Sequence, residues 1–317
     1  MVIMLSTPFS IGTLKIPHRL IQGPLAGFSC APFRALFSDF LSPGYCVTEM
    51  ISAHDVIHKH RSDGRYLYRS SDEKILCYQL SGHEPLVLAE AARRIEALGA
   101  DLIDINMGCP KPKIRKKGAG SALLEDEQRL VSVIDHVRRA ITIPLTVKIR
   151  LQHEDALMRV VKAIEEAGAD GLIVHGRRWI DDYDVPCHTD ALASIKASVQ
   201  IPVIGNGDIE DQASLEKMIK TGCDAYMISR AGTGKPWLYQ NLLGSPVEVT
   251  HALRKVYLMK HLAGLRDLED EHRAVLQSRT LFRYYFKPLQ LKDPQAFFSL
   301  TSLDEIERFL QTLEFAP

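Results

Sequence analysis

The chain of 317 residues has few cysteines and no long apolar run. Its 6 cysteines include no Cys-x-x-Cys pair, which argues against a disulfide framework or a thiolate zinc site and favours reduced thiols. No stretch reaches the roughly 18 consecutive apolar residues of a membrane span. The opening residues MVIMLSTPFS also lack the basic n-region of a signal peptide. We therefore expect a cytoplasmic protein without a membrane partner.

The sequence also lacks net charge, because 39 Lys and Arg residues balance 39 Asp and Glu residues. A neutral protein has no overall field that gathers polyanions. Any nucleic acid must then be held by local basic patches. The composition, 46% hydrophobic and 25% charged, supplies enough apolar residues for a core and excludes disordered and fibrous proteins.

Short β-branched or apolar runs alternate along most of the chain with segments of helical periodicity. The strand-like runs are 19–22, 46–48, 75–80, 102–105, 145–149, 171–174, 203–204 and 225–228. The helix-like segments include 84–98, 125–140, 155–167 and 214–221. This alternation is typical of parallel α/β folds. Eight units without an obvious reversal predict a closed (β/α)8 TIM barrel.

The strand-like runs stop after about Trp237, and the rest of the chain is predicted to be helical. Segments 247–262, 272–287 and 303–313 have helical periodicity, and Pro288 would end the second of them. We therefore expect two domains, a catalytic TIM barrel in residues 1–240 and a small all-helical domain in residues 241–317.

Polar side chains follow the predicted strands. In a TIM barrel the carboxyl ends of the strands carry the chemistry, and a barrel without a catalytic role has no reason to place amides, an ammonium and an imidazole there. The residues around these positions are Pro24, Leu25, Ala26, Glu49, Gln79, Asn106, Lys148, Arg150, His175, Arg177, Asn206, Gly207, Asp208, Ser229 and Arg230. This set predicts an enzyme.

The residues at the strand ends suit a flavin. Gln79, Asn106 and His175 supply donors for the edge of a planar heterocycle. Lys148 could stabilise negative charge that develops on such a ring when it is reduced. The backbone amides of 205–207 and 229–231 follow the last two strands, where barrels commonly bind a phosphate. We therefore expect FMN as the cofactor.

The loop Asp104-Ile105-Asn106-Met107-Gly108-Cys109-Pro110 follows a predicted strand and carries one cysteine. Loop residues on a rigid barrel are frequently functional. A cysteine thiol is mostly protonated at neutral pH, so Cys109 fits a general acid better than a nucleophile. Cys46, Cys77 and Cys223 lie in or beside predicted strands and helix ends, and we interpret them as small buried apolar residues.

Motifs along the barrel occur in a characteristic order. They are Pro24-Leu25-Ala26-Gly27, Gln79, Asn106-Met107-Gly108-Cys109-Pro110, GAGSALL at 118–124, Val147-Lys148-Ile149-Arg150, His175-Gly176-Arg177 and Asn206-Gly207-Asp208. Over about residues 15–240 this series resembles the flavin-dependent tRNA-dihydrouridine synthases. The Asn-x-Gly-Cys-Pro loop followed by Gly-Ala-Gly-Ser is the specific part, and the helical tail is similar in kind.

The resemblance implies an FMN-containing TIM barrel followed by a helical tRNA-binding domain, which uses NADPH to reduce the C5=C6 bond of a uridine in the D-loop of tRNA. It implies hydride transfer from reduced FMN to C6 and protonation of C5 by Cys109. Asn106 would contact the target base, with Arg150 and Arg177 nearby on the substrate side. The residues expected to hold FMN are Pro24, Leu25, Ala26, Gln79, Lys148, His175, Asn206, Gly207, Asp208, Ser229 and Arg230.

The sequence departs from the family pattern at several positions. Leu25 stands where Met is usual, an apolar exchange that should still pack on the flavin. Ser29-Cys30 replaces a Thr-Asp pair, and Ser229 replaces a Gly beside the expected phosphate site. Segments 151–153 and 179–188 also fit the usual pattern poorly, and both lie on loops at the strand ends.

Two clusters of cations could grip RNA phosphates. The first follows the Cys109 loop directly and comprises Lys111, Lys113, Arg115, Lys116 and Lys117. The second comprises Arg279, Arg283 and Lys287, which recur at helical spacing and would form a ridge on a tail helix. The alternative for both clusters is a solvated charged face.

Two further motifs predict ligands poorly. His54, His58 and His60 include helical spacing but lack a further clear ligand, so no metal is expected. The segment 232–235 (GTGK) is not a P-loop, because Pro236 occupies the Ser/Thr position. Two alternative functions remain open: an FMN barrel that reduces a free small molecule, and a tRNA-binding module without catalysis. We expect no obligate protein partner.

Overall fold

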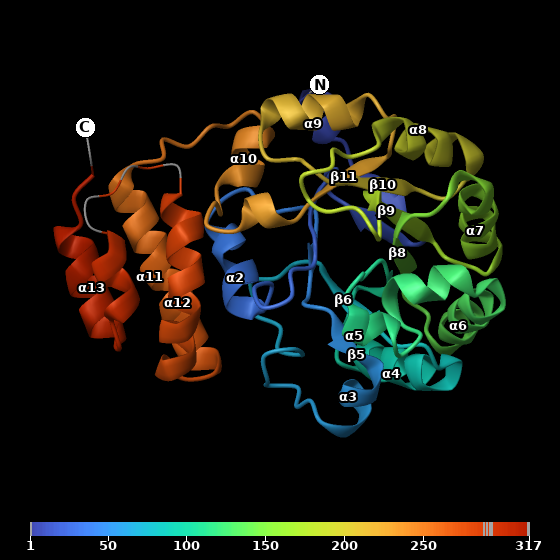
Figure 1. Ribbon diagram of the computed structural model, residues 1–317, viewed down its shortest axis with the longest axis horizontal. Helices are drawn as coiled ribbons and strands as arrows, with labels where there is room; N and C mark the ends of the chain where they lie inside the picture. The colour runs from blue at the N-terminus through green and yellow to red at the C-terminus, as the bar shows by residue number, and fades with distance from the viewer. Residues whose placement is uncertain (1, 288, 290, 292–293, 316–317) are drawn as a thin grey trace.

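The computed structural model describes residues 2–287, 289, 291 and 294–315 of the chain. Its body is a barrel of parallel strands surrounded by helices, and the helices of the tail lie beside it (Figure 1). The barrel strands are β3 (Leu20–Gln22), β4 (Cys46–Val47), β5 (Ile51–Ser52), β6 (Leu76–Ser81), β7 (Leu102–Met107), β8 (Leu145–Leu151), β9 (Gly171–Arg178), β10 (Val203–Asn206) and β11 (Ala225–Ile228). Every predicted strand is present, and the predicted (β/α)8 barrel is confirmed.

The sheet runs in the order β4-β3-β11-β10-β9-β8-β7-β6, and β4 pairs with β6 to close it. The short strand β5, which the sequence did not indicate, also pairs with β6, so the second barrel strand consists of two pieces. All residues of β6 and β7 are buried. This burial explains why the strands read as nearly continuous apolar runs rather than alternating ones.

Helices cover the outside of the barrel, and four of them lie at the predicted segments 84–98, 125–140, 155–167 and 214–221. The helices of this region are α1 (Val2–Leu5), α2 (Ala31–Ala35), α3 (Ala53–His58), α4 (Pro85–Ala97), α5 (Pro112–Arg115), α6 (Glu127–Ala140), α7 (Glu154–Glu166), α8 (Thr189–Ser198), α9 (Gln212–Ile219) and α10 (Leu238–Leu242). Short 3-10 turns are η1 (Leu36–Asp39), η2 (Gly120–Glu125) and η3 (Arg230–Gly232). Gly99, Gly168 and Gly222 have φ angles of 90°, 99° and 72°, as expected where a helix ends before a strand.

A hairpin that the sequence did not indicate closes the amino end of the barrel. Its strands β1 (Phe9–Ile11) and β2 (Leu14–Ile16) pair antiparallel. Phe9, Ile11 and Ile16 belong to the same apolar cluster as Ile21 and Ile173 on the barrel strands. Apolar side chains therefore seal this end, and the polar chemistry is confined to the carboxyl end.

The tail consists of α11 (His251–Leu268), α12 (Glu271–Phe286), η4 (Pro294–Ser299) and α13 (Leu303–Thr312). Thr250, Asp270 and Ser302 cap the amino ends of the three α-helices through their side chains. The expected start of the first tail helix at 247 is wrong, because the Thr250 cap places it at His251. Pro288 lies outside the described residues. No helix in the described part of the chain is long and apolar enough to cross a membrane.

The expected division at residue 240 falls inside α10. Leu238 and Leu242 of this helix pack in the apolar cluster of the barrel. The tail has a cluster of its own, which includes Leu258 and Phe282 and also takes in Cys30 from the barrel. The barrel body therefore extends through α10, and the position of the domain boundary stays a prediction.

Arg65 and Gln277 connect the two parts. The Nη2 of Arg65 donates a hydrogen bond of 3.0 Å to the Gly27 carbonyl, and its Nη1 pairs with Glu269 between α11 and α12. The side chain of Gln277 on α12 donates to the same Gly27 carbonyl at 2.7 Å. The segment after β3 is thus held between the barrel and the tail helices.

Candidate active site

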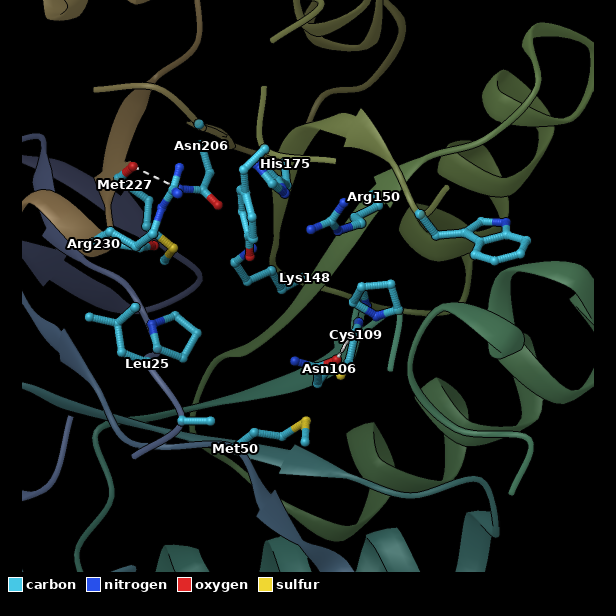
Figure 2. A pocket seen from close by; sticks show the side chains of 18 of the residues that line it. Leu25, Met50, Asn106, Cys109, Lys148, Arg150, His175, Asn206, Met227 and Arg230 are labelled. Carbon is cyan, nitrogen blue, oxygen red and sulfur yellow. Dashed lines mark hydrogen bonds between the residues drawn. The ribbon is translucent and has the colours of Figure 1, made fainter. Parts of the chain in front are cut away.

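A cavity of about 720 Å³ opens at the carboxyl ends of the barrel strands, which is within the ~300–1,000 Å³ range of ligand pockets. In the view of Figure 2, Asn106 and Cys109 lie on one side, Asn206 and Arg230 on the other, and Lys148 between them. Every residue expected to contact the cofactor lines it: Pro24, Leu25, Ala26, Gln79, Lys148, His175, Asn206, Gly207, Asp208, Ser229 and Arg230.

Strand register brings these side chains together. Asn106 on β7 lies opposite Lys148 on β8, and His175 on β9 lies opposite Arg150 on β8 and Asn206 on β10. In a parallel barrel, residues at matching positions near the carboxyl ends converge on one opening. Segments far apart in the sequence therefore supply one site.

A buried network of amides and a carboxylate lies beneath the cavity. The Asn106 Nδ2 donates to Gln79 Oε1 at 2.8 Å, and Gln79 Nε2 donates to Asp104 Oδ2 at 2.7 Å. The hydroxyl of Thr146 donates to the other Asp104 oxygen at 2.8 Å. Asp104 and Thr146, which were not among the expected site residues, therefore orient the amides of Gln79 and Asn106.

Burial shifts the pKa values of Lys148 and Asp104 in opposite directions. Burial lowers the pKa of the Lys148 ammonium, and the Asp104 charge partly offsets this effect. Burial raises the pKa of the Asp104 carboxyl, while hydrogen bonds from Gln79 and Thr146 and the Lys148 charge act against it. When protonated, Lys148 places its charge at the centre of the cavity, where it can act on a bound anion or a reduced ring.

His175 is neutral in this site. Burial lowers its pKa to about 2, and the charges of Lys148, Arg150, Arg177 and Arg230 act in the same direction. The Nη1 of Arg177 lies 3.4 Å from His175 Nε2. An arginine can only donate, so this contact assigns the ring proton to Nδ1. His175 can therefore donate one hydrogen bond from Nδ1 without carrying charge.

The opposite side of the cavity fits a phosphate group. Gly207 has a φ of 128°, and a Cβ at this position would lie 2.3 Å from the Sγ of Cys187 and 3.1 Å from the His175 ring. Only glycine fits, so the backbone itself lines this wall. Ser229 and Arg230 follow β11 and add a hydroxyl and a cation. Backbone amides with a nearby guanidinium are the donors that phosphates prefer.

Cys109 lies on the other wall, in a loop with fixed backbone. Its amide donates to Asn106 Oδ1 at 3.0 Å, and its carbonyl accepts from the Ser121 amide at 3.1 Å. The cysteine is partly exposed and lines the cavity, whereas Cys46, Cys77 and Cys223 are buried as expected.

The candidate substrate residues divide into two groups. Asn106, Arg150 and Lys111 line the cavity. Arg177 does not, because its buried guanidinium pairs with Asp208 and donates to the carbonyls of Val185 and Tyr183. The remaining candidates that do not line the cavity are Lys113, Arg115, Lys116, Lys117, Arg279, Arg283 and Lys287.

Several aromatic residues that line the cavity were not among the expected site residues. Trp179 and Tyr183 come from the loop after β9, and the Tyr183 ring lies 4.1 Å from the Arg230 guanidinium. Phe28 and Tyr284 form another part of the wall, with their ring centroids 5.6 Å apart. Tyr284 belongs to α12, so only the tertiary structure could place it here. The two aromatics within segment 179–188 were the available signal in the sequence.

Comparison with known proteins identifies the family. The family model described as Dihydrouridine synthase (Dus) matches residues 21–301. The tRNA-dihydrouridine synthase B of Pseudomonas aeruginosa is 36% identical over 296 residues, covering 88% of this chain and 87% of that protein. The protein of the same name from Proteus vulgaris is 30% identical over 316 residues, covering 96% and 97%.

Solved structures of lower similarity share the fold. Morphinone reductase in complex with tetrahydroNAD has a TM-score of 0.54 at 14% identity, over 77% of this chain and 92% of that one. An old yellow enzyme homologue from Zymomonas mobilis has a TM-score of 0.54 at 13% identity, over 78% and 94%. These likenesses support the barrel architecture, and the matches over most of the sequence show that the chain belongs to the dihydrouridine synthase family.

Proposed function

We propose that this protein reduces the C5=C6 bond of a uridine in the D-loop of tRNA, with FMN as the cofactor and NADPH as the reductant. The observation that carries the proposal is that one cavity is lined by the backbone of Gly207 with Arg230 beside it, by Lys148 at its centre and by the partly exposed Cys109. The membership of the dihydrouridine synthase family supports the same reaction.

The residues present fit FMN. The wall formed by Asn206, Gly207, Asp208, Ser229 and Arg230 would hold the phosphate and the ribityl chain. Gln79, Lys148 and His175 would hold the ring system, with Pro24, Leu25 and Ala26 packed along it. FMN, once reduced by NADPH, supplies the hydride that adds to C6 of the base. A protonated Lys148 would favour negative charge on the reduced ring, because its ammonium lines the same cavity.

Cys109 would donate the proton that C5 requires. The π bond between C5 and C6 is lost as C6 gains the hydride and C5 gains the thiol proton, so a thiolate remains on Cys109 and is reprotonated from solvent. Asn106 holds the Cys109 amide through Oδ1 and is anchored through Nδ2 on Gln79. These hydrogen bonds fix the backbone of Cys109 and so keep its thiol beside the expected position of the base.

The target uridine must leave its stack before it can enter such a cavity. Lys111 lines the cavity beside Cys109, and Lys113, Lys116 and Lys117 follow on an exposed turn. On the other side, α12 supplies Tyr284 to the wall and carries Arg279 and Arg283 on its exposed surface. Cations on both sides of the opening support a polyanionic substrate. We further propose that the enzyme acts in the cytoplasm without an obligate protein partner.

The test begins with the visible absorbance spectrum of the purified protein. Under anaerobic conditions, NADPH is added first and unmodified tRNA second. We expect a yellow protein that NADPH bleaches and tRNA recolours. A flavin that bleaches and is not reoxidised by tRNA would favour a reductase of free small molecules. A colourless protein that FMN cannot reconstitute would contradict the proposed cofactor site.

A further inference from the structure

The guanidinium of Arg115, in the basic run after the Cys109 loop, is bound within the protein. Its Nη1 donates to Ser121 Oγ at 2.9 Å, and its Nη2 pairs with Glu125 Oε1 at 2.8 Å. The Arg115 Cζ lies 3.8 Å from the centroid of the Trp179 ring. Only 17% of the Arg115 side chain is exposed. Because these contacts occupy its guanidinium, Arg115 is a poor candidate for a phosphate contact.

Ser121, which accepts a hydrogen bond from Arg115, also holds the backbone of Cys109. Ser121 donates to the Cys109 carbonyl through both its amide and its hydroxyl, each at 3.1 Å. Asn106 Oδ1 accepts from the Cys109 amide at 3.0 Å. The peptide groups of Cys109 are therefore held on one side by the barrel and on the other by Ser121, whose hydroxyl Arg115 fixes.

Trp179 reaches Arg115 from a different loop, the segment that follows β9. This loop is itself ordered by hydrogen bonds. Arg177 donates to the carbonyls of Tyr183 and Val185, and Asp181 accepts from the Arg178 amide at 2.8 Å. Trp179 thus lies on an ordered loop, and its ring packs on the guanidinium of Arg115, which orients Ser121.

We propose that Arg115 and Trp179 are positioning residues for Cys109. Trp179 holds the Arg115 guanidinium, Arg115 holds the Ser121 hydroxyl, and Ser121 holds the Cys109 carbonyl. The inference rests on the proposed role of Cys109 as the proton donor. Placement matters for that role because a misplacement of about 1 Å in a reacting group can lower a rate by roughly 10²-fold.

The first test measures how fast iodoacetamide alkylates Cys109 in the purified protein. Peptide mass spectrometry gives the rate at Cys109, which is partly exposed. Trp179→Leu and Arg115→Met should each accelerate alkylation of Cys109 by about fivefold, a change consistent with the loss of one cation–π contact. Trp179→Phe keeps an aromatic face and should restore nearly the normal rate.

Lys116→Met is the matched control, since it removes an exposed cation next to Arg115. It should leave the alkylation rate at Cys109 unchanged. Thermal unfolding of each variant checks that the fold is intact. Normal alkylation of Cys109 in both Trp179→Leu and Arg115→Met would overturn the inference, whatever the protein does with tRNA.

The second test separates positioning from RNA binding. Arg115→Met should lower kcat for tRNA about tenfold and leave KM within about twofold, as expected for a group that acts on the reacting geometry alone. A raised KM with unchanged kcat would identify Arg115 as an RNA contact and overturn the inference. Cys109→Ala tests the proposed reaction separately: full turnover in that variant removes Cys109 as the acid, while the alkylation rates still decide whether the loop is held.

Discussion

Asn106 donates a hydrogen bond of 2.8 Å from its side-chain amide to Gln79 and so joins the loop of Cys109 to the interior of the barrel. Gln79 continues the connection to Asp104 at 2.7 Å. Gln79 and Asp104 are fully or almost fully buried, with exposures of 1% and 0%. Polar groups at this depth are satisfied only by one another. The site therefore depends on the network as a unit.

The central position of Gln79 predicts a large effect of its removal on stability. Gln79→Leu leaves both Asn106 Nδ2 and Asp104 Oδ2 without this partner, and we expect a loss of about 2–4 kcal/mol in the free energy of unfolding. Thr146→Val leaves only the other Asp104 oxygen without its partner and should cost less, about 1–2 kcal/mol. Urea unfolding measures both. An equal loss in the two variants would show that Gln79 is not the centre of the network.

The proposed acid is tested by two substitutions at Cys109. Cys109→Ala removes the proton donor, and Cys109→Ser keeps its shape with a hydroxyl that is a far weaker acid. Both variants should bind FMN and oxidise NADPH with oxygen normally, while turnover of tRNA falls by at least about 10²-fold. Stopped-flow absorbance follows both half-reactions. A Cys109→Ser variant with normal tRNA turnover would contradict protonation by this residue.

The sequence predicted the barrel and a set of residues that the structure brings to one cavity, and the reason is physical. Strand runs are local, and parallel register brings the residues after them to one opening, as it does for Asn106, Lys148 and His175. The helices were also predictable, since their apolar periodicity is local. Hairpin β1–β2 was not, because its strands of 3 residues each carry too little pattern.

The positions of Arg115, Arg177 and Tyr284 could not be predicted from the sequence. The partners of Arg115 include Trp179, which comes from another loop, and Tyr284 reaches the cavity only because α12 packs on the barrel. A basic run looks the same in sequence whether a cation is solvated, binds RNA or is buried against a tryptophan. Long-range packing decides among these, and local patterns do not encode it.

We expect His261 to make the stability of the protein sensitive to acid. Burial lowers its pKa to about 3, and its Nε2 has no hydrogen-bond partner in the described part of the chain. The unfolded state, with a pKa of about 6.5, binds the proton first as the pH falls, so stability that is complete above this value is lost between about pH 6.5 and pH 3. His261→Phe should reduce the free energy of unfolding that is lost between pH 7 and pH 5 by about 2 kcal/mol.

Urea unfolding at pH 7 and pH 5 measures this difference. Part of the pH dependence should persist in His261→Phe, because burial also lowers the pKa of His175 to about 2 and gives a contribution of the same sign. An unchanged pH dependence in His261→Phe would contradict a neutral, buried His261.

Gly234 tests how closely the tail helices pack on the barrel. Its φ is 72°, and a Cβ there would lie 2.7 Å from the Tyr284 carbonyl carbon and 2.8 Å from the Tyr285 nitrogen. Gly222 has the same φ of 72°, and a Cβ there would meet no atom within 4 Å. Gly222→Ala should therefore lower the free energy of unfolding by roughly 1 kcal/mol, because alanine is disfavoured in the left-handed conformation.

Gly234→Ala should cost about 1–3 kcal/mol more than Gly222→Ala, because the backbone of α12 must move. Hydrogen exchange should also accelerate in α12 of the Gly234 variant and stay normal in the Gly222 variant. Equal stabilities for the two variants would show that α12 accommodates the methyl group without displacement.

Arg279 and Arg283 on α12 belong to the proposed RNA surface. Both are exposed and lie four residues apart, on the helix that supplies Tyr284 to the cavity. If each contacts a phosphate, the joint variant Arg279→Gln with Arg283→Gln should weaken tRNA binding. It should also lower the slope of log affinity against log salt by roughly 0.7–0.9 per lost contact.

Arg273→Gln provides the control for net charge. Arg273 is exposed on the same helix, but with about 3.6 residues per turn it lies on a different side from Arg279. Its removal changes the charge of α12 without removing a contact at the proposed surface. Binding is measured between 50 and 200 mM salt, roughly the range over which such slopes are resolved. The slope of log affinity against log salt should be the same for the Arg273 variant and the unmodified protein. Equal slopes for all three proteins would show that the tail cations are solvated and that the RNA is held at the Lys111 side of the cavity alone.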